Sequence, residues 1–320
     1  MTVEESDQFS LTTLGGEVGP STLRLLKKAG FKDIRDIASS KSEELQEIQG
    51  IGEKVANNIL LAARAKIPKF GSLKSARELR QIEEAQTYLS TGCNELDRIL
   101  GGGFALGSLN QIAAGFGLGK TQLCFQAAIQ AFLPPEEGGM GKSAVWIDTE
   151  GSFKARRVEQ MARARGLDSD SILDNIHVGR AYNSEHQVSL VQEALAAVGE
   201  LNAGLIVIDS LIAHFRAEYV GRGTLAARQQ KLGNHISYLK RIIEAKRIVG
   251  LVTNQMQAKP DILFGDALLP AGGNIVGHNT NLILLIKKGK GNLRKFKVTK
   301  ASDLPEEEIA IKLDDTGFSD

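Results

Sequence analysis

A glycine-rich stretch, residues 114–121, has the composition of a phosphate-binding loop: Ala-Gly-Phe-Gly-Leu-Gly-Lys-Thr. An apolar run at residues 109–113 predicts a strand before it, and residues 123–131 predict a helix after it. Glycines in such a turn let successive N–H groups point inward around an anion, which the positive end of the following helix also attracts. In this setting Lys120 is predicted to reach the terminal phosphates of ATP, and Thr121 to hold Mg²⁺.

One position of the loop departs from the strict pattern, because Ala114 stands where the pattern has glycine. If that position requires a positive φ, alanine costs about 1 kcal/mol, and with an ordinary φ nothing is lost. The alternative to a nucleotide site is a plain structural turn. The residues predicted to contact the nucleotide here are Gly115, Phe116, Gly117, Leu118, Gly119, Lys120, Thr121 and Gln122.

Two predicted strands end in acidic residues. Residues 205–209, Leu-Ile-Val-Ile-Asp, resemble a Walker B strand, in which Asp209 holds the magnesium ion through water. Residues 144–148 end in Asp148, and Glu150 follows closely. We predict that Glu150 orients or deprotonates the water that attacks the γ-phosphate, and that Asp148 is structural. The alternative for Asp209 is an acid that merely caps the next element.

Two segments beyond the strand ends have the composition of DNA-binding loops. Residues 215–223 mix basic side chains, an aromatic ring and glycines, as in a mobile loop along a phosphate backbone. Residues 257–277 contain several glycines and prolines, and a loop of that length without its own structure is usually functional or disordered. Gln255, which ends the preceding strand, is predicted to sense the γ-phosphate and report it to this second loop.

A run of basic residues follows, around a Gly-Lys-Gly-Asn turn that predicts a β-hairpin. This hairpin either contacts nucleic acid or has a solvated basic face, and the neighbouring loops favour nucleic acid. Its basic residues are Lys287, Lys288, Lys290, Arg294, Lys295, Lys297 and Lys300.

The order of the predicted elements defines the fold class. Apolar strands alternate with amphipathic helices from residue 92 onward, which predicts a mostly parallel, twisted sheet whose functional ends lie at the carboxyl edges of its strands. Further strands are predicted at residues 176–180 and 248–254, and helices near residues 154–165, 185–199 and 226–246.

The first 65 residues differ from this core, because they predict short helices joined by glycine-containing turns. The turn around Gly50 and Gly52 resembles a helix-hairpin-helix motif, whose glycines let backbone amides approach a DNA phosphate while Lys54 adds a charge. The alternative is a small protein-binding bundle. We predict a helix-hairpin-helix DNA-binding domain at residues 1–65, a linker at 66–91 with a helix at 76–86, and an ATPase core at 92–320.

Composition limits the possible settings. The chain has 320 residues, a formal net charge of +1 and two cysteines, Cys93 and Cys124, in no metal-binding or redox spacing. Contact with nucleic acid must therefore come from local basic patches. The cysteine usage, the polar start of the chain and the lack of a long apolar run predict a cytoplasmic protein with no membrane contact, and the predicted DNA binding adds association with the nucleoid.

Several of these segments together resemble the archaeal RadA recombinases, relatives of bacterial RecA, over nearly the whole chain. The resemblance rests on the helix-hairpin-helix domain, on the phosphate-binding loop and on the segments at 90–92, 147–151, 215–219, 228–232, 253–255 and 272–278. It implies a RecA-like P-loop ATPase core of the α/β class, which follows a small all-α domain. It also implies an ATP- and Mg²⁺-dependent helical filament, or a ring, that pairs single-stranded DNA with a homologous duplex.

The resemblance also assigns roles to residues that their types alone do not define. Arg157 would stack on adenine, and Asp303 and Pro305 would cap the nucleotide of the adjacent protomer. Gln255 and His278 would couple the γ-phosphate to the second loop. The residues implied to contact DNA in the channel are Arg216, Tyr219 and Arg222, and Leu73 and Ala76 belong to the segment implied to link protomers head to tail.

Departures from the family leave a second function open. Leu73 stands where the family usually has phenylalanine, Ala114-Gly115 replaces Gly-Glu, and Ile283 replaces an arginine that often faces DNA. These changes favour a recombination mediator that binds DNA and nucleotide without strand exchange. The catalytic strand ends and the long second loop favour a recombinase with DNA-dependent ATPase activity.

Overall fold

The computed structural model describes residues 9–68, 70–258 and 268–320. The chain divides into two compact units. The first comprises Met1–Gln86 with Gln192–Gly199, and the second comprises Thr87–Val191 with Glu200–Asp320. The middle of the predicted second DNA loop, residues 259–267, lies outside the described residues.

The first unit is helical. Its elements are η1 (Leu11–Leu14), α2 (Pro20–Lys28), α3 (Ile34–Ser39), α4 (Ser42–Gln46), α5 (Glu53–Lys66) and α6 (Ala76–Glu84). Leu14, Leu26, Ile37, Leu45 and Ala63 are fully buried in a core of their own. Pro20 begins α2, where its missing N–H costs no helical hydrogen bond.

The second unit is built on a sheet of ten strands in the described part of the chain. The order is β12-β11-β10-β9-β3-β7-β6-β4-β5, and β8 pairs with β7. The six strands from β9 to β5 in this order are parallel, and β10, β11, β12 and β8 pair antiparallel. The strands are β3 (Leu109–Ala114), β4 (Ser143–Asp148), β5 (Ile176–Arg180), β6 (Ala203–Asp209), β7 (Val249–Ala258), β8 (Leu268–Pro270), β9 (Leu282–Lys288), β10 (Leu293–Lys300), β11 (Glu308–Asp314) and β12 (Gly317–Ser319).

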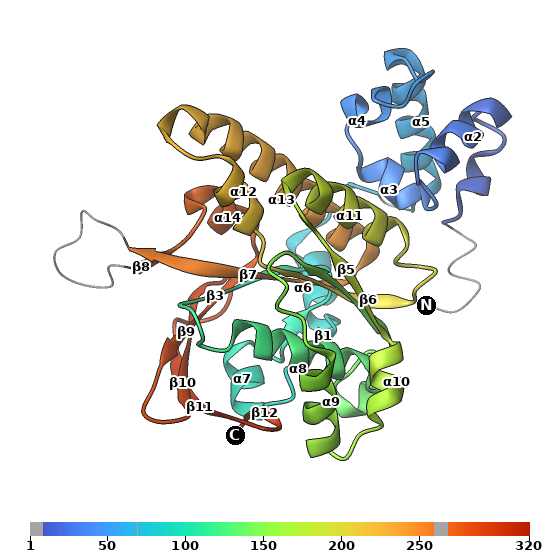
Figure 1. Cartoon of the computed structure of the whole chain (residues 1–320). Helices are drawn as coiled ribbons and strands as arrows, with labels where there is room; N and C mark the ends of the chain where they lie inside the picture. The colour runs from blue at the N-terminus through green and yellow to red at the C-terminus, as the bar shows by residue number, and fades with distance from the viewer. Residues whose placement is uncertain (1–8, 69, 259–267) are drawn as a thin grey trace. The chain divides into compact units, whose positions relative to one another are not determined.

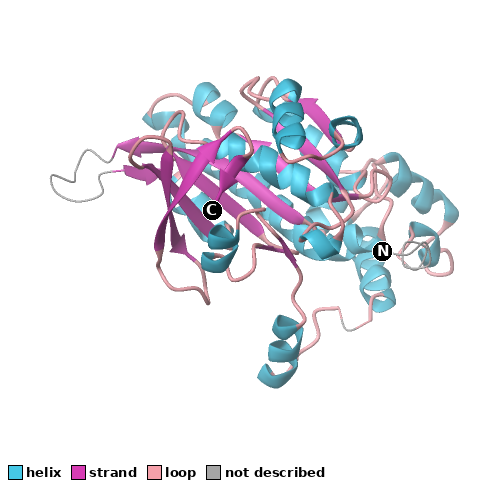
Figure 2. Cartoon of the chain, turned by 90° about the horizontal axis from the view of Figure 1, so that it is seen from below, coloured by secondary structure: helices cyan, strands magenta, loops and turns pink. Residues whose placement is uncertain are grey.

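Helices cover both faces of this sheet. In Figure 1, α7 to α10 lie on one face, and α12 to α14 lie on the other. Figure 2 shows the strands in magenta, twisting relative to one another. A separate two-stranded ribbon joins β1 (Tyr88–Leu89) to β2 (Phe104–Ala105). The remaining elements are α7 (Asn94–Ile99), α8 (Lys120–Phe132), η2 (Pro135–Glu137), α9 (Ala155–Ala164), α10 (Ser169–Asp174), α11 (Ser184–Ala196), α12 (Ala213–Glu218), η3 (Arg222–Thr224), α13 (Leu225–Lys246) and α14 (Gly273–Asn279).

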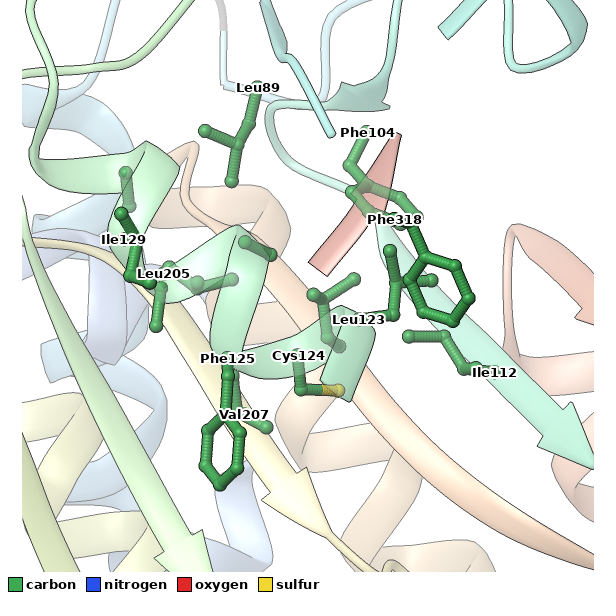
Figure 3. Close-up of a cluster of buried hydrophobic side chains, with 14 of the residues drawn as sticks. Leu89, Phe104, Ile112, Leu123, Cys124, Phe125, Ile129, Leu205, Val207 and Phe318 are labelled. Carbon is green, nitrogen blue, oxygen red and sulfur yellow. The ribbon is translucent and has the colours of Figure 1, made fainter. Parts of the chain in front are cut away.

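The core of the second unit lies between α8 and the sheet. Figure 3 shows Ile112, Leu205 and Val207 of the strands with side chains of α8, all of them fully buried. Phe125 of α8 stacks on Trp146 of β4 with ring centroids 4.8 Å apart. Because α8 begins at Lys120, this packing fixes the phosphate-binding loop to the sheet.

The predicted strands and helices of the core are confirmed, with ends that shift by a few residues. Two segments were predicted as loops and are partly regular. Residues 213–218 form α12, whose Phe215 is fully buried, so the predicted irregular loop begins only after this helix. Residues 257–277 were predicted without structure, but β7 continues to Ala258 and α14 begins at Gly273. None of the described helices is both long and apolar enough to cross a membrane.

Candidate active site

The phosphate-binding loop joins the carboxyl end of β3 to α8. Gly117 and Gly119 have φ values of +71° and +107°. A Cβ on Gly119 would also lie 2.7 Å from Cζ of Phe318, so only glycine fits there. Ala114 is the last residue of β3 and pairs with Gln255 of β7 and Ile286 of β9. Alanine therefore occupies regular strand backbone, and the departure at this position strains nothing.

Lys120 begins α8, and its side chain reaches back to the start of this loop. Its Nζ donates to the carbonyl oxygens of Ala114 (3.2 Å) and Gly115 (3.1 Å). Burial lowers the pKa of the Lys120 ammonium from its ordinary value, while the carboxylates of Asp209 and Glu150 act in the opposite direction. The Lys120 ammonium is thus a partly buried cation, and it lies beside loop backbone whose N–H groups can point toward an anion.

Asp209 at the end of β6 receives three hydroxyl groups. Thr121 Oγ1 and Ser152 Oγ each donate to its Oδ2 at 2.8 Å, and Thr253 Oγ1 donates to Oδ1 at 2.5 Å. The hydroxyl of Thr121 and the carboxylate of Asp209 therefore face each other from α8 and β6. This places together the two residues that the sequence predicts at the magnesium ion.

Asp148, at the end of β4, is held by backbone. Its Oδ1 accepts N–H groups of Glu150 (3.1 Å), Gly151 (2.7 Å) and Ser152 (3.1 Å), and Oδ2 accepts the N–H group of Phe153 (3.3 Å). Arg180 of β5 adds an ion pair at 3.0 Å. A carboxylate with these donors holds the turn after β4 in one conformation and thereby sets the position of Glu150.

Glu150 is instead exposed, with two side-chain donors. Its Oε1 accepts Ser210 Oγ at 2.8 Å and Gln255 Nε2 at 3.2 Å. The Oε1 atom of the same Gln255 accepts Nη1 of Arg216 at 3.5 Å. Arg216 also reaches the side-chain oxygen of Gln257, at 3.1 and 3.2 Å, in the amide orientation that satisfies both groups. A continuous chain of polar contacts therefore runs from Glu150 to α12.

The donor set fits a nucleoside triphosphate with Mg²⁺. Such a ligand requires a loop backbone that only glycine can adopt, as at Gly119, and a cation beside it, as in Lys120. It also requires a hydroxyl group and a carboxylate that face each other, as Thr121 and Asp209 do. Among the described residues no cluster of three or more histidine, cysteine or acidic side chains offers a metal site. Mg²⁺ does not require one, because phosphate oxygens and water supply most of its ligands in such sites.

Other predicted nucleotide contacts lie around this loop. Phe116 at its tip is almost fully exposed. Arg157 of α9 donates to Gln122 Oε1 at 2.7 Å and to the carbonyl oxygens of Asp314 (2.8 Å) and Asp315 (3.1 Å). This arginine is thus joined to α8 and to the turn between β11 and β12. Gly115 and Leu118 complete the loop, and Asp303 and Pro305 are exposed in the segment between β10 and β11.

The predicted DNA and switch residues occupy several elements. Tyr219 follows α12, and the Lys231 ammonium of α13 lies 5.8 Å from its ring centroid. His278 is exposed in α14, and Arg222 begins η3. In the first unit, Gly50 has a φ of +95°. Gly52 is the N-cap of α5 and has no side chain to take up the first N–H groups of that helix, which also carries the exposed Lys54.

Several basic side chains of the predicted hairpin bind acidic groups or carbonyl oxygens of the same chain. Its two strands, β9 and β10, pair antiparallel as predicted. Lys295 and Lys297 form ion pairs with Glu308 (2.8 Å) and Glu306 (2.9 Å), acids that come later in the chain. Arg294 folds back onto carbonyl oxygens of its own turn, and Lys300 binds the end of α14. Lys288 and Lys290, near the turn, are exposed, and the charge of Lys287 acts on the carboxylate of Glu308.

Several site residues were missed by sequence reasoning. They are Ser152, Arg180, Ser210, Thr253 and Gln257. Three of them lie within three residues of the carboxyl end of a parallel strand, which was the available signal. The sequence does not distinguish the hydroxyl groups of Ser152, Ser210 and Thr253 from those of ordinary serine and threonine residues, because their contacts depend on which strands are neighbours.

Comparison with known families agrees with both units. Residues 83–320 match the family model described as Rad51. Residues 16–65 match the model described as a SAM-like helix-hairpin-helix tandem. The first match covers the whole sheet and every residue of the site around Lys120.

Proposed function

The chain belongs to the Rad51 family, and we propose that it is an ATP-dependent recombinase that forms a filament on single-stranded DNA and catalyses homologous pairing and strand exchange. The family domain supports a RecA-like role in DNA recombination and repair, and members of this family are DNA-dependent ATPases. The helix-hairpin-helix region supports DNA binding. The archaeal RadA subgroup, which the sequence resembles, is part of the proposal.

The observation that carries the proposal is the chain of contacts from Glu150 through Gln255 to Arg216. One end of this chain is the proposed general base for ATP hydrolysis, and the other is a cation on the proposed first DNA loop. Because Gln255 contacts both, a γ-phosphate that attracts its amide changes the surroundings of Arg216. DNA that attracts Arg216 changes the surroundings of Glu150 in turn, as linkage requires.

Each part of the site has a proposed task in hydrolysis. ATP would supply the scissile γ-phosphate, and Mg²⁺ would polarise the oxygen atoms of that phosphate. Lys120 holds the terminal phosphates and offsets their charge, while Thr121 and Asp209 hold the ion, the latter through water. Glu150 accepts the proton of the attacking water. Asp148 keeps the turn that aims Glu150, and Arg157 stacks on adenine.

DNA contacts are proposed on both units. Arg216, Tyr219 and Arg222 contact the single strand in the channel, and the lysines around the hairpin turn add charge. The backbone N–H groups at Gly50 and Gly52, with Lys54, hold a phosphate of double-stranded DNA. Gln255 and His278 link the nucleotide to the second loop.

Assembly completes the proposed activity. Leu73 and Ala76 dock on the next protomer in a head-to-tail filament or ring, and Asp303 and Pro305 cover the nucleotide of that neighbour. The domain boundaries predicted from sequence, 1–65, 66–91 and 92–320, are kept as part of the proposal.

A second function, that of a recombination mediator without strand exchange, is favoured by two observations. Leu73 is fully exposed and smaller than the phenylalanine of the related proteins. Ile283 is apolar and supplies no charge to DNA, and its Cδ1 lies 3.8 Å from the position of a Cβ on Gly277 of α14. Of the third departure, Ala114-Gly115, the alanine strains nothing because it lies in regular strand backbone, and only the missing glutamate at Gly115 still favours a mediator.

ATP turnover with and without single-stranded DNA, measured beside D-loop formation on the same preparation, separates the two functions. We expect single-stranded DNA to stimulate turnover and D-loops to form. DNA binding with little stimulation and no D-loops would identify a mediator instead. Arg216→Ala tests the carrying observation: it should remove the stimulation by DNA and leave the DNA-independent turnover in place, whereas the matched variant Arg163→Ala, on the exposed face of α9, should keep both.

A further inference from the structure

Gln187, near the start of α11, is a fully buried amide that contacts two other elements. Its Nε2 donates to the main-chain oxygen of Leu211 at 2.9 Å and lies 3.5 Å from Nε2 of His235 in α13. An amide nitrogen carries two hydrogens, and these two acceptors can take both of them. Gln187 therefore joins α11 to α13 and to the segment that follows β6.

The contact between the amide and the imidazole requires a neutral His235 ring. When Gln187 donates to Nε2, the single proton of the neutral ring lies on Nδ1, and a second proton would set two N–H groups against each other. Burial lowers the pKa of His235 to about 4, which keeps the ring neutral near pH 7. Nδ1 of His235 and Oε1 of Gln187 have no partner among the described residues. Buried polar atoms without partners do not stabilise a core, so packing alone does not account for this pair.

The main-chain oxygen of Leu211 lies in a short segment between the proposed catalytic edge and α12. Ser210, the residue before it, donates its Oγ to Glu150 at 2.8 Å. Leu211 donates its own N–H to the main-chain oxygen of Thr253 on β7 at 3.1 Å. Helix α12 begins two residues after Leu211 and carries Arg216. The buried amide on α11 therefore fixes the segment that joins the surroundings of the proposed general base to this arginine.

His235 also supports α12 directly. Its ring centroid lies 5.8 Å from that of Phe215, and both side chains are buried. Phe215 precedes Arg216, whose Nη1 lies 3.5 Å from Oε1 of Gln255. This distance is at the limit of a hydrogen bond, so a small displacement of α12 breaks the contact.

The exposed side of α12 has polar contacts of its own. Glu218, its last residue, accepts the N–H of Ser184 at 2.6 Å, at the start of α11. Lys231 of α13 forms an ion pair with Glu185 at 3.2 Å, and its ammonium lies 5.8 Å from the ring centroid of Tyr219. These contacts remain when the buried pair is changed, so changes to the pair test the position of α12 and not its existence.

We propose that Gln187 and His235 are positioning residues for the first DNA loop: they seat α12 on the core and thereby set the distance between Arg216 and Gln255. The inference rests on the proposed function, because Arg216 is the proposed contact to DNA and Gln255 the proposed link to the nucleotide. The imidazole acts as the acceptor that orients the amide. Without it, the Gln187 amide keeps one unpaired N–H and is held by Leu211 alone.

Hydrogen exchange on the full chain, without DNA or ATP, tests the positioning role. Gln187→Met keeps the length of the side chain and removes both N–H groups, so the amides of residues 211–218 should exchange about tenfold faster, the factor that corresponds to one lost buried hydrogen bond. His235→Leu removes the acceptor and keeps an apolar side chain of similar size. It should speed exchange in the same segment by about threefold, because the hydrogen bond to Leu211 remains. Gln160→Met, which changes an exposed amide of α9, should leave this segment unchanged.

Three comparisons distinguish a positioning pair from two side chains that merely fill space. His235→Gln restores an acceptor and should return exchange close to the wild-type rate. The double variant Gln187→Met/His235→Leu should exchange at about the rate of Gln187→Met, since the imidazole acts through the amide and leucine still packs on Phe215. His235→Leu should not lower Tm, because it also removes the unpaired Nδ1. Effects that multiply in the double variant, or faster exchange spread evenly over the sheet, would overturn the proposal.

A second arm measures ATP turnover of the same variants with and without single-stranded DNA. Gln187→Met should lose about tenfold of the stimulation by saturating DNA, and His235→Gln should retain it. Full stimulation in Gln187→Met, with faster exchange in α12, would sink the link from this helix to the nucleotide. A wild-type protein that DNA does not stimulate would count against the proposed function alone, since exchange is read without DNA or ATP.

Discussion

The nucleotide edge of the sheet and the segment around Leu73 differ in where their contacts come from. Asp209 and Asp148 are almost fully buried and receive donors from several elements of the same chain. Leu73 is fully exposed, and the helix that follows, α6, has no buried residue. The polar contacts of these two aspartates come from one chain, whereas the second region exposes apolar side chains, as surfaces that bind a partner do.

Helix α6 is stabilised by local contacts at its start. A capping box closes its start, because Ser75 Oγ accepts the N–H of Glu78 (3.2 Å) and the Glu78 carboxylate accepts the N–H of Ser75 (2.8 Å). A helix of nine residues is marginal on local interactions alone. Leu79 and Ile82 of this helix are exposed, and we propose that assembly covers them and stabilises the segment. Changes at the sheet edge should act on one chain, and changes near Leu73 should act between chains.

The largest effect is expected for Lys120→Ala. This change removes the cation from the loop, so the variant should lose ATP affinity and fall in turnover by at least about 10³-fold. Turnover and equilibrium nucleotide binding measure it, and the exposed Arg163→Ala variant is the control for loss of a surface charge. Turnover within tenfold of the wild type would mean that the edge of the sheet is not the catalytic region.

Glu150→Gln should separate chemistry from binding at the same edge. The amide cannot accept the proton of the attacking water, so turnover should fall by about 10²- to 10⁴-fold. ATP binding should remain close to that of the wild type, because Glu150 is exposed and contacts Ser210 and Gln255. If Glu150→Gln and Lys120→Ala lose ATP affinity equally, the role assigned to Glu150 is wrong.

Asp148→Asn tests whether the neighbouring acid is structural. An amide oxygen accepts the N–H groups of the turn less strongly and loses the ion pair with Arg180. The free energy of unfolding should fall by about 2 kcal/mol, which lowers Tm by about 4–8 °C in a core of this size. Thermal unfolding measures the change, and Glu150→Gln, which removes a charge two residues away, should shift Tm by less than half as much. Equal shifts in Tm would show that Asp148 and Glu150 contribute equally to the stability of the core.

The sequence predicted the fold, and it predicted which residues lie at the carboxyl edge of the sheet, because their signals are local. Residues 205–209 form a strand buried on both faces, which appears as a continuous apolar run that ends in Asp209. The phosphate-binding loop has required glycines at fixed spacing. Such patterns do not depend on which distant segment is the neighbour.

The missed features depend on tertiary pairing. Helix α12 has six residues, too few for a helical period to emerge, and its buried Phe215 is recognisable only in the folded core. The hydroxyl of Thr253 reaches Asp209 because β7 lies beside β6. Lys300 was counted among the residues of a basic hairpin, and only a bulge in β10 turns it toward α14. Strand order and the register of strand pairing decide these contacts, and a local sequence pattern predicts neither of them.

The smallest effect, and the one that bears directly on the second region, is expected for Leu73→Ala. Burial of a leucine side chain contributes about 1.5–3 kcal/mol, and alanine retains part of it, so self-association should weaken by about tenfold. Tm of the unassembled chain should not change, because Leu73 contacts nothing that its removal would leave unpacked. Sedimentation over a range of concentrations measures association, and Leu61→Ala, a second exposed leucine on α5, is the matched control. Leu73→Phe should strengthen association if the partner has room for the ring that related proteins carry. Equal association of the wild type, Leu73→Ala and Leu61→Ala would mean that the exposed segment is not an assembly surface. The segment around Leu73 and the sheet edge would then differ only in how far their side chains are buried.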